Sequence, residues 1–178
     1  VMAEDGVAVR AVKRVYREAS GVDDPSLEPK DIYDIAEGAR EGDQEAARKA
    51  FATMGEVAGD AMATAVTLID GVIVIGGGIT AAKKYIMPAL LKELRSQMHS
   101  ISGEEFDRVQ MKVYDLDNND EFEQFARGAS RELKVYGTNT SVTYDPQKRI
   151  GVMISKIGAS KAISLGAYAF ALNEVDKM

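Results

Sequence analysis

Apolar residues recur at helical spacing along the first forty positions of the chain. Over residues 6–19 they follow one another every four positions with basic residues between them, which predicts an amphipathic helix. A connector with two prolines and several acidic residues spans residues 22–29. A second, shorter helix is predicted over residues 31–41, because Gly42 stands just past the end of its apolar pattern.

The clearest helical pattern begins after Asp43, a residue type that caps helix N-termini. Apolar residues then alternate steps of four and three, which predicts a buried seam formed by Ala47, Phe51, Met54, Ala58, Ala61, Ala65 and Leu68. Small residues on this helix, including Gly55 and Gly59, let a neighbouring backbone approach closely at some loss of helix propensity. We interpret the helix as core packing against a sheet rather than as the lining of a cofactor site.

A continuous apolar run of mostly β-branched residues follows at positions 71–75, and such runs are typical of strands buried on both faces. Three consecutive glycines, Gly76, Gly77 and Gly78, come directly after it. A helical pattern then extends over residues 81–98, with Pro88 inside it as a source of a kink. The predicted order is therefore helix, buried strand, glycine turn and helix.

The remainder of the chain is more polar and alternates between strands and helices. A strand is predicted over residues 109–114, and Asn118-Asn119-Asp120 opens a capped helix. Two short β-rich runs on either side of a Gly-Thr-Asn-Thr-Ser turn predict a hairpin over residues 135–144. Residues 149–155 are a last strand or loop, and residues 159–172 a last helix. This alternation predicts an α/β fold.

Length and charge narrow the class of protein. The chain has 178 residues, with 28 acidic and 22 basic side chains and a net charge of −6. This length predicts one domain, residues 1–178. An acidic protein has no field that attracts nucleic acid phosphates or anionic lipid, so we expect neither partner. No apolar run reaches the roughly 20 residues of a membrane span, and no signal peptide pattern is present, so we expect a cytoplasmic protein.

Cysteine and histidine usage excludes several kinds of site. The chain has no cysteine, which excludes disulfides, thiolate metal ligands and cysteine nucleophiles within it. His99 is the only histidine, so an HExxH zinc site is excluded as well. We expect His99 at a helix end, where an imidazole commonly interacts with the helix dipole, and we assign it no catalysis. The sequence therefore predicts no metal-binding residue.

The glycine turn carries the most informative chemistry. A turn without Cβ atoms between a strand and a helix N-terminus brings backbone N–H groups and the positive end of the helix dipole together, which suits a phosphate or a ribose. Tight turns without a ligand also use such glycines. A P-loop is excluded because Ile79-Thr80 follows the glycines in place of Lys-Ser/Thr. The dinucleotide fingerprint lacks its acidic residue about 20 positions further on.

Residues near the glycine turn are weaker candidates. Lys83 and Lys84 lie in the first turn of the helix that follows, where each could reach a phosphate or simply be solvated. Lys156, Ser160 and Lys161 lie near the nucleotide if the last strand neighbours the strand before the glycines. The alternative role for Ser160 is to cap the last helix.

Several of these segments resemble the carboxy-terminal lobe of the ROK family, which comprises sugar kinases and related repressors and includes bacterial glucokinases. The most specific stretch runs over residues 42–79 and ends Asp70-Gly71-Val72-Ile73-Val74-Ile75-Gly76-Gly77-Gly78-Ile79. The closing Leu165-Gly166-Ala167-Tyr168-Ala169-Phe170-Ala171-Leu172 is similar to the family's terminal helix. Residues 6–11 are similar to the helix after its zinc and sugar-binding segment. Residues 102–155 form an insert that is longer than in typical members.

The resemblance implies a ribonuclease-H-like fold of the actin and hexokinase ATPase type, with helices and a mixed sheet in three layers. The glycine turn matches the family's adenosine-side motif, which makes Gly76, Gly77, Gly78, Ile79 and Lys83 the predicted nucleotide contacts. ATP with Mg²⁺ is the implied cofactor of the intact parent. The family's catalytic aspartate, sugar motif and zinc loop have no counterpart in this chain, so no catalytic residue and no zinc site is predicted.

On this interpretation the chain is the nucleotide-side lobe of a glucokinase-like kinase, and it binds sugar only together with an amino-terminal lobe. Two alternatives stay open. In the first, the chain is the sugar-sensing lobe of a non-catalytic ROK repressor with a DNA-binding motif upstream. In the second, it is a structural domain that forms a homodimer through the alanine-rich seam and the insert at residues 102–155.

Overall fold

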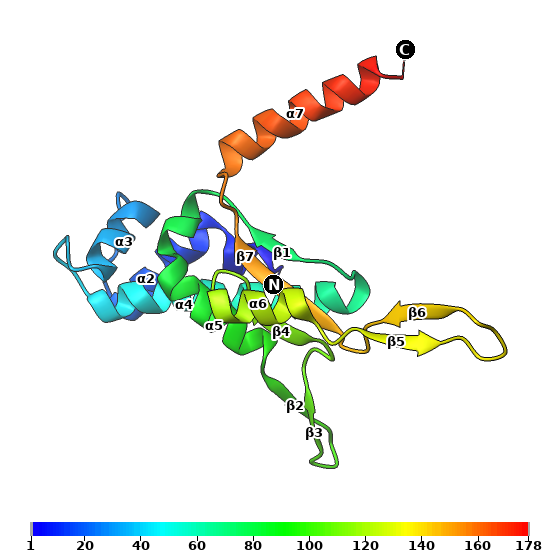
Figure 1. Cartoon of the computed structure of the whole chain (residues 1–178). Coiled ribbons are helices and arrows are strands. Elements are labelled where there is room, and N and C mark those ends of the chain that lie inside the picture. The colour runs from blue at the N-terminus through cyan, green and yellow to red at the C-terminus, as the bar shows by residue number, and fades with distance from the viewer. Residues whose placement is uncertain (1, 178) are drawn as a thin grey trace.

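The computed structural model describes residues 2–177, and Figure 1 shows the order and arrangement of the elements. The first part of the chain is helical: α1 (Glu4–Val7), α2 (Val9–Ser20), α3 (Pro29–Ala36) and α4 (Gln44–Leu68). The middle part contains β1 (Ile73–Ile75), η1 (Gly78–Ala82), α5 (Lys83–Leu94), β2 (Gln97–His99), β3 (Glu105–Asp107) and β4 (Lys112–Asp115). The last part contains α6 (Asn119–Arg127), β5 (Arg131–Lys134), β6 (Ser141–Tyr144), β7 (Arg149–Ile154) and α7 (Ala159–Val175).

The amino-terminal helical segment differs in detail from the sequence prediction. One helix was predicted over residues 6–19, but Ala8 is extended (φ −83°, ψ 161°) and separates α1 from α2. The second predicted helix is shorter than expected, because α3 begins at Pro29 and ends at Ala36. Glu28 and Asp31 form a capping box at its start. This N-terminal signal was missed because Glu28 was assigned to the connector.

Helix α4 is the central element of the fold. Its predicted cap is confirmed, since the Asp43 carboxylate accepts a hydrogen bond of 2.9 Å from the backbone N–H of Ala46. The first half of the predicted seam is also confirmed by the burial of Ala47, Phe51 and Met54. This half packs against α2 and α3, while the second half packs against α5.

The second half of the seam prediction is wrong for this chain. Leu68 is 80% exposed and Ala65 is also exposed, whereas Ala63 and Val66 are buried against α5 and the sheet. A straight helix has 3.6 residues per turn, so its buried face drifts away from a seam with a period of 3.5 residues. The position of α5 therefore decided which side of α4 is covered.

Helices α4 and α5 approach each other at two glycines. The sequence predicted a close backbone approach on this helix, but the neighbour there is a helix and not the expected sheet. A Cβ atom on Gly55 would lie 2.3 Å from the backbone carbonyl oxygen of Ile86. A Cβ atom on Gly59 would lie 2.8 Å from the carbonyl oxygen of Leu90. Neither contact leaves room for a side chain, so the two glycines set the distance between the helices.

We expect Gly55→Ala to lower the free energy of unfolding by about 1–3 kcal/mol, because the new methyl group has to push the two backbones apart. This loss exceeds the gain of about 1 kcal/mol that alanine brings to an exposed helix interior. Gly166→Ala in α7 is the matched control, since a Cβ atom there meets nothing within 4 Å. Urea denaturation of both variants measures the difference, and an equal effect at both positions would contradict the close packing.

The central sheet has three parallel strands in the order β1-β7-β4. Helices α4 and α5 cover one face, where Ile150 and Val152 of β7 are buried. Side chains alternate along a strand, so Tyr114 of β4 faces the other side and packs edge-on against Phe125 of α6 at 5.8 Å. The predicted α/β class with helices on a sheet is confirmed. The resemblance implied a mixed sheet; over residues 2–177 the three central strands pair in parallel, and antiparallel pairing is confined to the two hairpins.

The strand before the glycines is not buried on both faces. Val72 and Val74 are 49% and 57% exposed, because α6 covers the sheet only over β4 and β7. Within residues 2–177, β1 pairs only with β7, so its other edge carries no strand. The burial expected from the β-branched run is therefore missing on one face and one edge of β1.

Two antiparallel hairpins extend from the body of the molecule (Figure 1). The β5–β6 hairpin was predicted, but its first strand lies earlier than expected, over Arg131–Lys134, and Val135 and Tyr136 belong to the connection. The β2–β3 hairpin was missed, because the helical pattern over residues 81–98 continues through Met98 and His99 while α5 ends at Leu94. Gly103, with φ +87°, lies in the connection between β2 and β3. The strand predicted over residues 109–114 begins later, at Lys112, as β4.

Candidate functional site

The glycine turn lies at the carboxyl end of β1, directly beside the carboxyl end of β7. The two strands are in parallel register, with Ile75 opposite Ile154. The backbone N–H of Ser155 donates a 2.7 Å hydrogen bond to the carbonyl oxygen of Ile75, which holds the two loops side by side. Open α/β sheets bind ligands in the crevice outside the carboxyl ends of their strands, so the turn occupies the usual position for a ligand.

The turn needs glycine for its backbone and leaves one side of that backbone open. Gly77 has φ +98°, a conformation that residues with a Cβ atom rarely adopt. A Cβ atom on Gly77 or on Gly78 would meet no other atom within 4 Å. The carbonyl oxygen of Gly77 is fixed by the hydroxyl of Thr80, which donates to it at 2.7 Å.

The helix that follows does not begin where it was predicted. A short 3₁₀ segment, η1, starts at Gly78, and the α-helix α5 starts only at Lys83. The first N–H groups of such a segment have no partners within it, so they are available to an acceptor. α5 begins two residues further from the glycines than the sequence pattern indicated, which leaves backbone N–H groups as the principal polar feature of the turn.

A mostly apolar groove of about 370 Å³ adjoins the glycine turn. Three of the five predicted nucleotide contacts line it: Gly76, Ile79 and Lys83. Its other walls come from α4, α5, Val7 and the strand residues Ile75 and Ile154. An apolar wall beside a few polar groups is typical of sites that hold the ring of a small molecule. The structure therefore brings three of the five predicted residues together around a hollow, and Gly77 and Gly78 do not line it.

The two lysines after the glycines have different surroundings. Lys83 is exposed and lines the groove. Lys84 forms an ion pair of 2.6 Å with Glu37, and the hydroxyl of Tyr85 donates to the same carboxylate at 2.8 Å. These hydrogen bonds lower the pKa of Glu37 and raise the pKa of Lys84. Lys84 is thus held against the end of α3, and Lys83 is the better candidate for a ligand.

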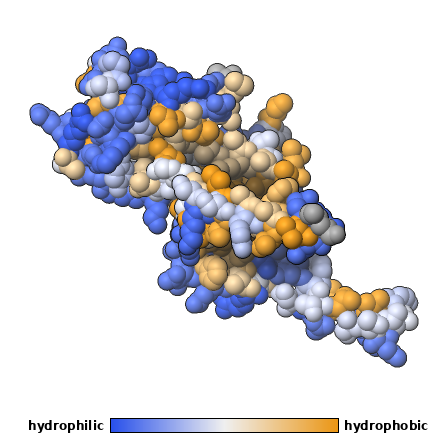
Figure 2. All heavy atoms as spheres, turned by 90° about the horizontal axis from the view of Figure 1, so that it is seen from above, coloured by the Kyte–Doolittle hydropathy of each residue, from blue (hydrophilic) through white to orange (hydrophobic). Residues whose placement is uncertain are grey.

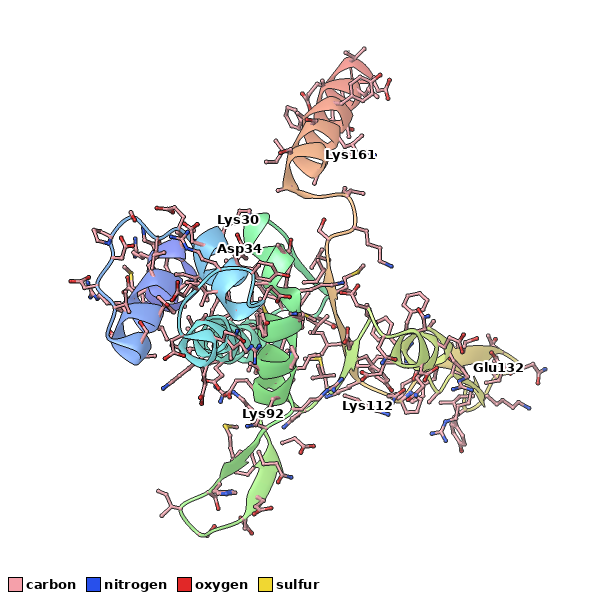
Figure 3. All side chains as sticks on the ribbon, turned by 90° about the vertical axis from the view of Figure 1, so that its left-hand side faces the viewer. Lys30, Asp34, Lys92, Lys112, Glu132 and Lys161 are labelled. Atoms are coloured by element: carbon pink, nitrogen blue, oxygen red, sulfur yellow. The ribbon has the colours of Figure 1, made fainter. Side chains whose placement is uncertain are left out.

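The three candidate residues after β7 lie in different surroundings. The last strand does neighbour the strand before the glycines, so the loop that contains Lys156 adjoins the glycine turn. Ser160 does not cap α7, because the N-cap residue is Gly158, with φ +71°, and no side chain caps the helix. Lys161 is exposed near the start of α7, which extends away from the groove (Figure 3).

The remaining titratable candidates give no catalytic constellation. His99 lies in β2 and is exposed, so the expected place at a helix end was wrong. Asp60 is paired with Arg108, and Asp115 accepts a hydrogen bond of 2.9 Å from the N–H of Asp117. Among residues 2–177, no three histidine or acidic side chains are grouped closely enough to hold a metal ion. Each helix in that range is too short or too polar to cross a bilayer.

Comparison with known proteins identifies the class. The ROK family model matches residues 3–119, and the chain belongs to the ROK family. The structure of the glucokinase from Parabacteroides distasonis ATCC 8503 is 53% identical in sequence and superposes with a TM-score of 0.84. The match covers 96% of this chain and 46% of that one, so the chain spans less than half the length of this relative. A search of curated proteins finds no match.

These likenesses define the fold and the general relationship. The chain has the ribonuclease-H-like fold of the actin and hexokinase type, as the sequence predicted. It is related to the sugar kinases through its family and through the glucokinase. The glycine turn, at the carboxyl ends of β1 and β7, is the feature of this fold that bears most directly on the function of the chain.

Proposed function

We propose that the chain is the nucleotide-side lobe of an ATP-dependent sugar kinase. The observation that carries the proposal is the glycine turn at the adjoining carboxyl ends of β1 and β7, open on one side and bordered by an apolar groove. In this arrangement the groove receives the adenine ring and the backbone N–H groups of the turn face the ribose or the phosphates. Lys83 at the rim supplies a positive charge.

The reaction of the intact kinase would be transfer of the γ-phosphoryl group of ATP to a hexose hydroxyl. Such transfers depend chiefly on the positioning and electrostatic stabilisation of the phosphates, with Mg²⁺ neutralising their charge. Residues 2–177 contain no acidic cluster that fits Mg²⁺. The part of this chain in the reaction is therefore to bind the nucleotide and hold it in one orientation. Contact with the sugar and the removal of its hydroxyl proton belong to another lobe.

We also propose a cellular compartment and a first binding partner. We expect a kinase that uses ATP and hexose to work in the cytoplasm, where both are available. The net charge of −6 favours neither nucleic acid nor anionic membranes as a partner. The nucleotide is the first ligand to test.

We expect Gly77→Val to reduce the affinity for ADP and ATP at least tenfold. Valine disfavours φ +98° and places a branched side chain on the open side of the turn. Isothermal titration calorimetry of ADP into both proteins measures the effect. Equal affinities in two folded proteins would refute the nucleotide role of the turn.

The matched control is Gly137→Val, at the tip of the β5–β6 hairpin. Gly137 has φ +74°, and a Cβ atom there also meets nothing within 4 Å. Both substitutions place valine at a positive φ in open space, but only one of them lies beside the groove. A drop in affinity for Gly137→Val as well would point to a general effect on folding.

A further inference from the structure

The glycine turn lies between two separate apolar cores. The first core is formed chiefly by α2, α3 and the first half of α4, and Ile79 and Tyr85 pack against it. The second core is formed chiefly by the rest of α4, α5 and the central sheet, and Ile75 packs against it. Residues 76–78 connect Ile75 to Ile79 and so pass from one core to the other. The orientation of the turn therefore depends on how each core holds its end.

The two ends of the turn are held in different ways. On the sheet side, β1 pairs with β7, and the backbone N–H of Ser155 donates to the carbonyl oxygen of Ile75 at 2.7 Å. On the helical side, η1 begins at Gly78 and α5 begins at Lys83, so strand pairing is not available there. That end is held by side chains, and the polar ones link α5 to α3.

Three side chains join the end of α3 to the start of α5, and we call them the α3–α5 junction: Glu37, Lys84 and Tyr85. Glu37 is the C-cap residue of α3, while Lys84 and Tyr85 lie in the first turn of α5. The Glu37 carboxylate lies 2.6 Å from Nζ of Lys84 and accepts a hydrogen bond of 2.8 Å from the Tyr85 hydroxyl. That hydroxyl also lies 3.0 Å from the carbonyl oxygen of Ala36, one of the α3 carbonyls that intrahelical bonding leaves without a partner.

The junction fixes the start of α5 locally and contributes little to global stability. The Tyr85 ring is seated in the first core, where it stacks on Phe51 and meets the edge of Tyr33. The Glu37 and Lys84 side chains are 27% and 53% exposed, and ion pairs of this kind add little to the free energy of unfolding. Helix α3 itself packs chiefly against α4 and α2, and Figure 2 shows that the outside of this end of the molecule is mostly hydrophilic. The junction is therefore a specific polar link between α3 and α5.

We propose that Glu37 and Tyr85 are positioning residues for the nucleotide: they hold the first turn of α5 against α3 and thereby fix η1 and the glycine turn. This inference rests on the proposed function, in which the turn binds ADP or ATP. Neither residue lines the groove beside the turn, so both act through the backbone of η1 and not by contact with the nucleotide.

Titration of ADP into the whole 178-residue chain measures the first consequence. We expect Glu37→Ala to weaken ADP binding about fivefold, the size expected for one lost hydrogen bond. Tyr85→Phe keeps the stacked ring and removes only the hydroxyl, so it should cause a similar loss. Glu37→Gln keeps an acceptor for that hydroxyl and should retain most of the affinity. The combined alanine and phenylalanine variant should bind little more weakly than either single variant, because the two residues act as a unit.

Asp34→Ala is the matched control. Asp34 pairs with Lys30 at 2.6 Å, the same distance as in the junction, and both residues belong to α3 (Figure 3). The substitution removes one negative charge without loosening α5, so we expect unchanged ADP affinity. A loss equal to that of Glu37→Ala would trace the effect to charge and overturn the inference. Tighter ADP binding by Glu37→Ala would also overturn it, because the freed Lys84 would then be a phosphate ligand.

Hydrogen exchange in the ligand-free chain gives a second measurement that does not depend on nucleotide. The amides of residues 79–82 should exchange about fivefold faster in Glu37→Ala and at an unchanged rate in Asp34→Ala, because local opening responds to local contacts. Urea denaturation of both variants should be unchanged, and a parallel loss of global stability in Glu37→Ala would reduce the junction to a structural role. Equal exchange in all three proteins would overturn the positioning role. Failure of the unaltered chain to bind ADP would overturn the proposed function, while the exchange comparison would still decide whether α3 positions the turn.

Discussion

Phe51→Ala is expected to lower the free energy of unfolding by about 3–5 kcal/mol, a large fraction of the 5–15 kcal/mol of a typical domain. The Phe51 ring is 1% exposed and lies between α4 and its neighbours. It stacks on Tyr85 with ring centres 6.3 Å apart and meets the edge of Tyr33 at 6.2 Å. Truncation removes the buried ring and both aromatic contacts, and it leaves a cavity that these helices cannot close.

Glu56→Ala is the control on the same helix. Glu56 is exposed, so we expect a change within about 0.5 kcal/mol. Urea denaturation of the two variants at one protein concentration gives both values. A similar small loss for both would mean that α4 presents a different face to the core than the structure shows.

The second large effect concerns catalysis: the purified chain should not phosphorylate sugar, even if it binds nucleotide. Phosphoryl transfer needs a base within about 3 Å of the attacking hydroxyl and a site that holds both substrates in line. The acidic residues nearest to such a role have other tasks or surroundings. Asp60 pairs with Arg108, Asp70 is exposed at the entry to β1, and Asp115 accepts a bond from the Asp117 backbone.

A coupled assay with ATP, Mg²⁺ and a panel of hexoses measures this. We expect activity at background, where an intact kinase would turn over at roughly 1–100 s⁻¹. The intact glucokinase from Parabacteroides distasonis ATCC 8503 is the positive control, and with it we expect turnover to be measurable. Turnover by the 178-residue chain alone would show that it carries its own base and sugar site, and the proposed division of tasks between lobes would be wrong.

The sequence by itself determined the local structure of this protein. Asp43 predicted the start of α4 because a carboxylate satisfies the N–H groups that a helix leaves free. Gly55 and Gly59 predicted that some neighbouring backbone approaches α4 closely, because only glycine leaves room for it, although not that this neighbour is α5. The run before Gly76 predicted a strand that ends in a glycine turn. These features depend on neighbouring residues in the chain, which the sequence displays directly.

Only the tertiary structure decided which apolar surfaces are covered. The pattern of α4 ran through Leu68, but α5 covers another side of the helix beyond Met54. The strand at β1 had the composition of a fully buried element, yet one face and one edge are open. The apolar composition of α7 likewise predicted a helix without showing that it projects into solvent. Burial depends on which elements pack together across long sequence separations. An apolar segment is stabilised by burial, but its composition does not specify which surface it packs against.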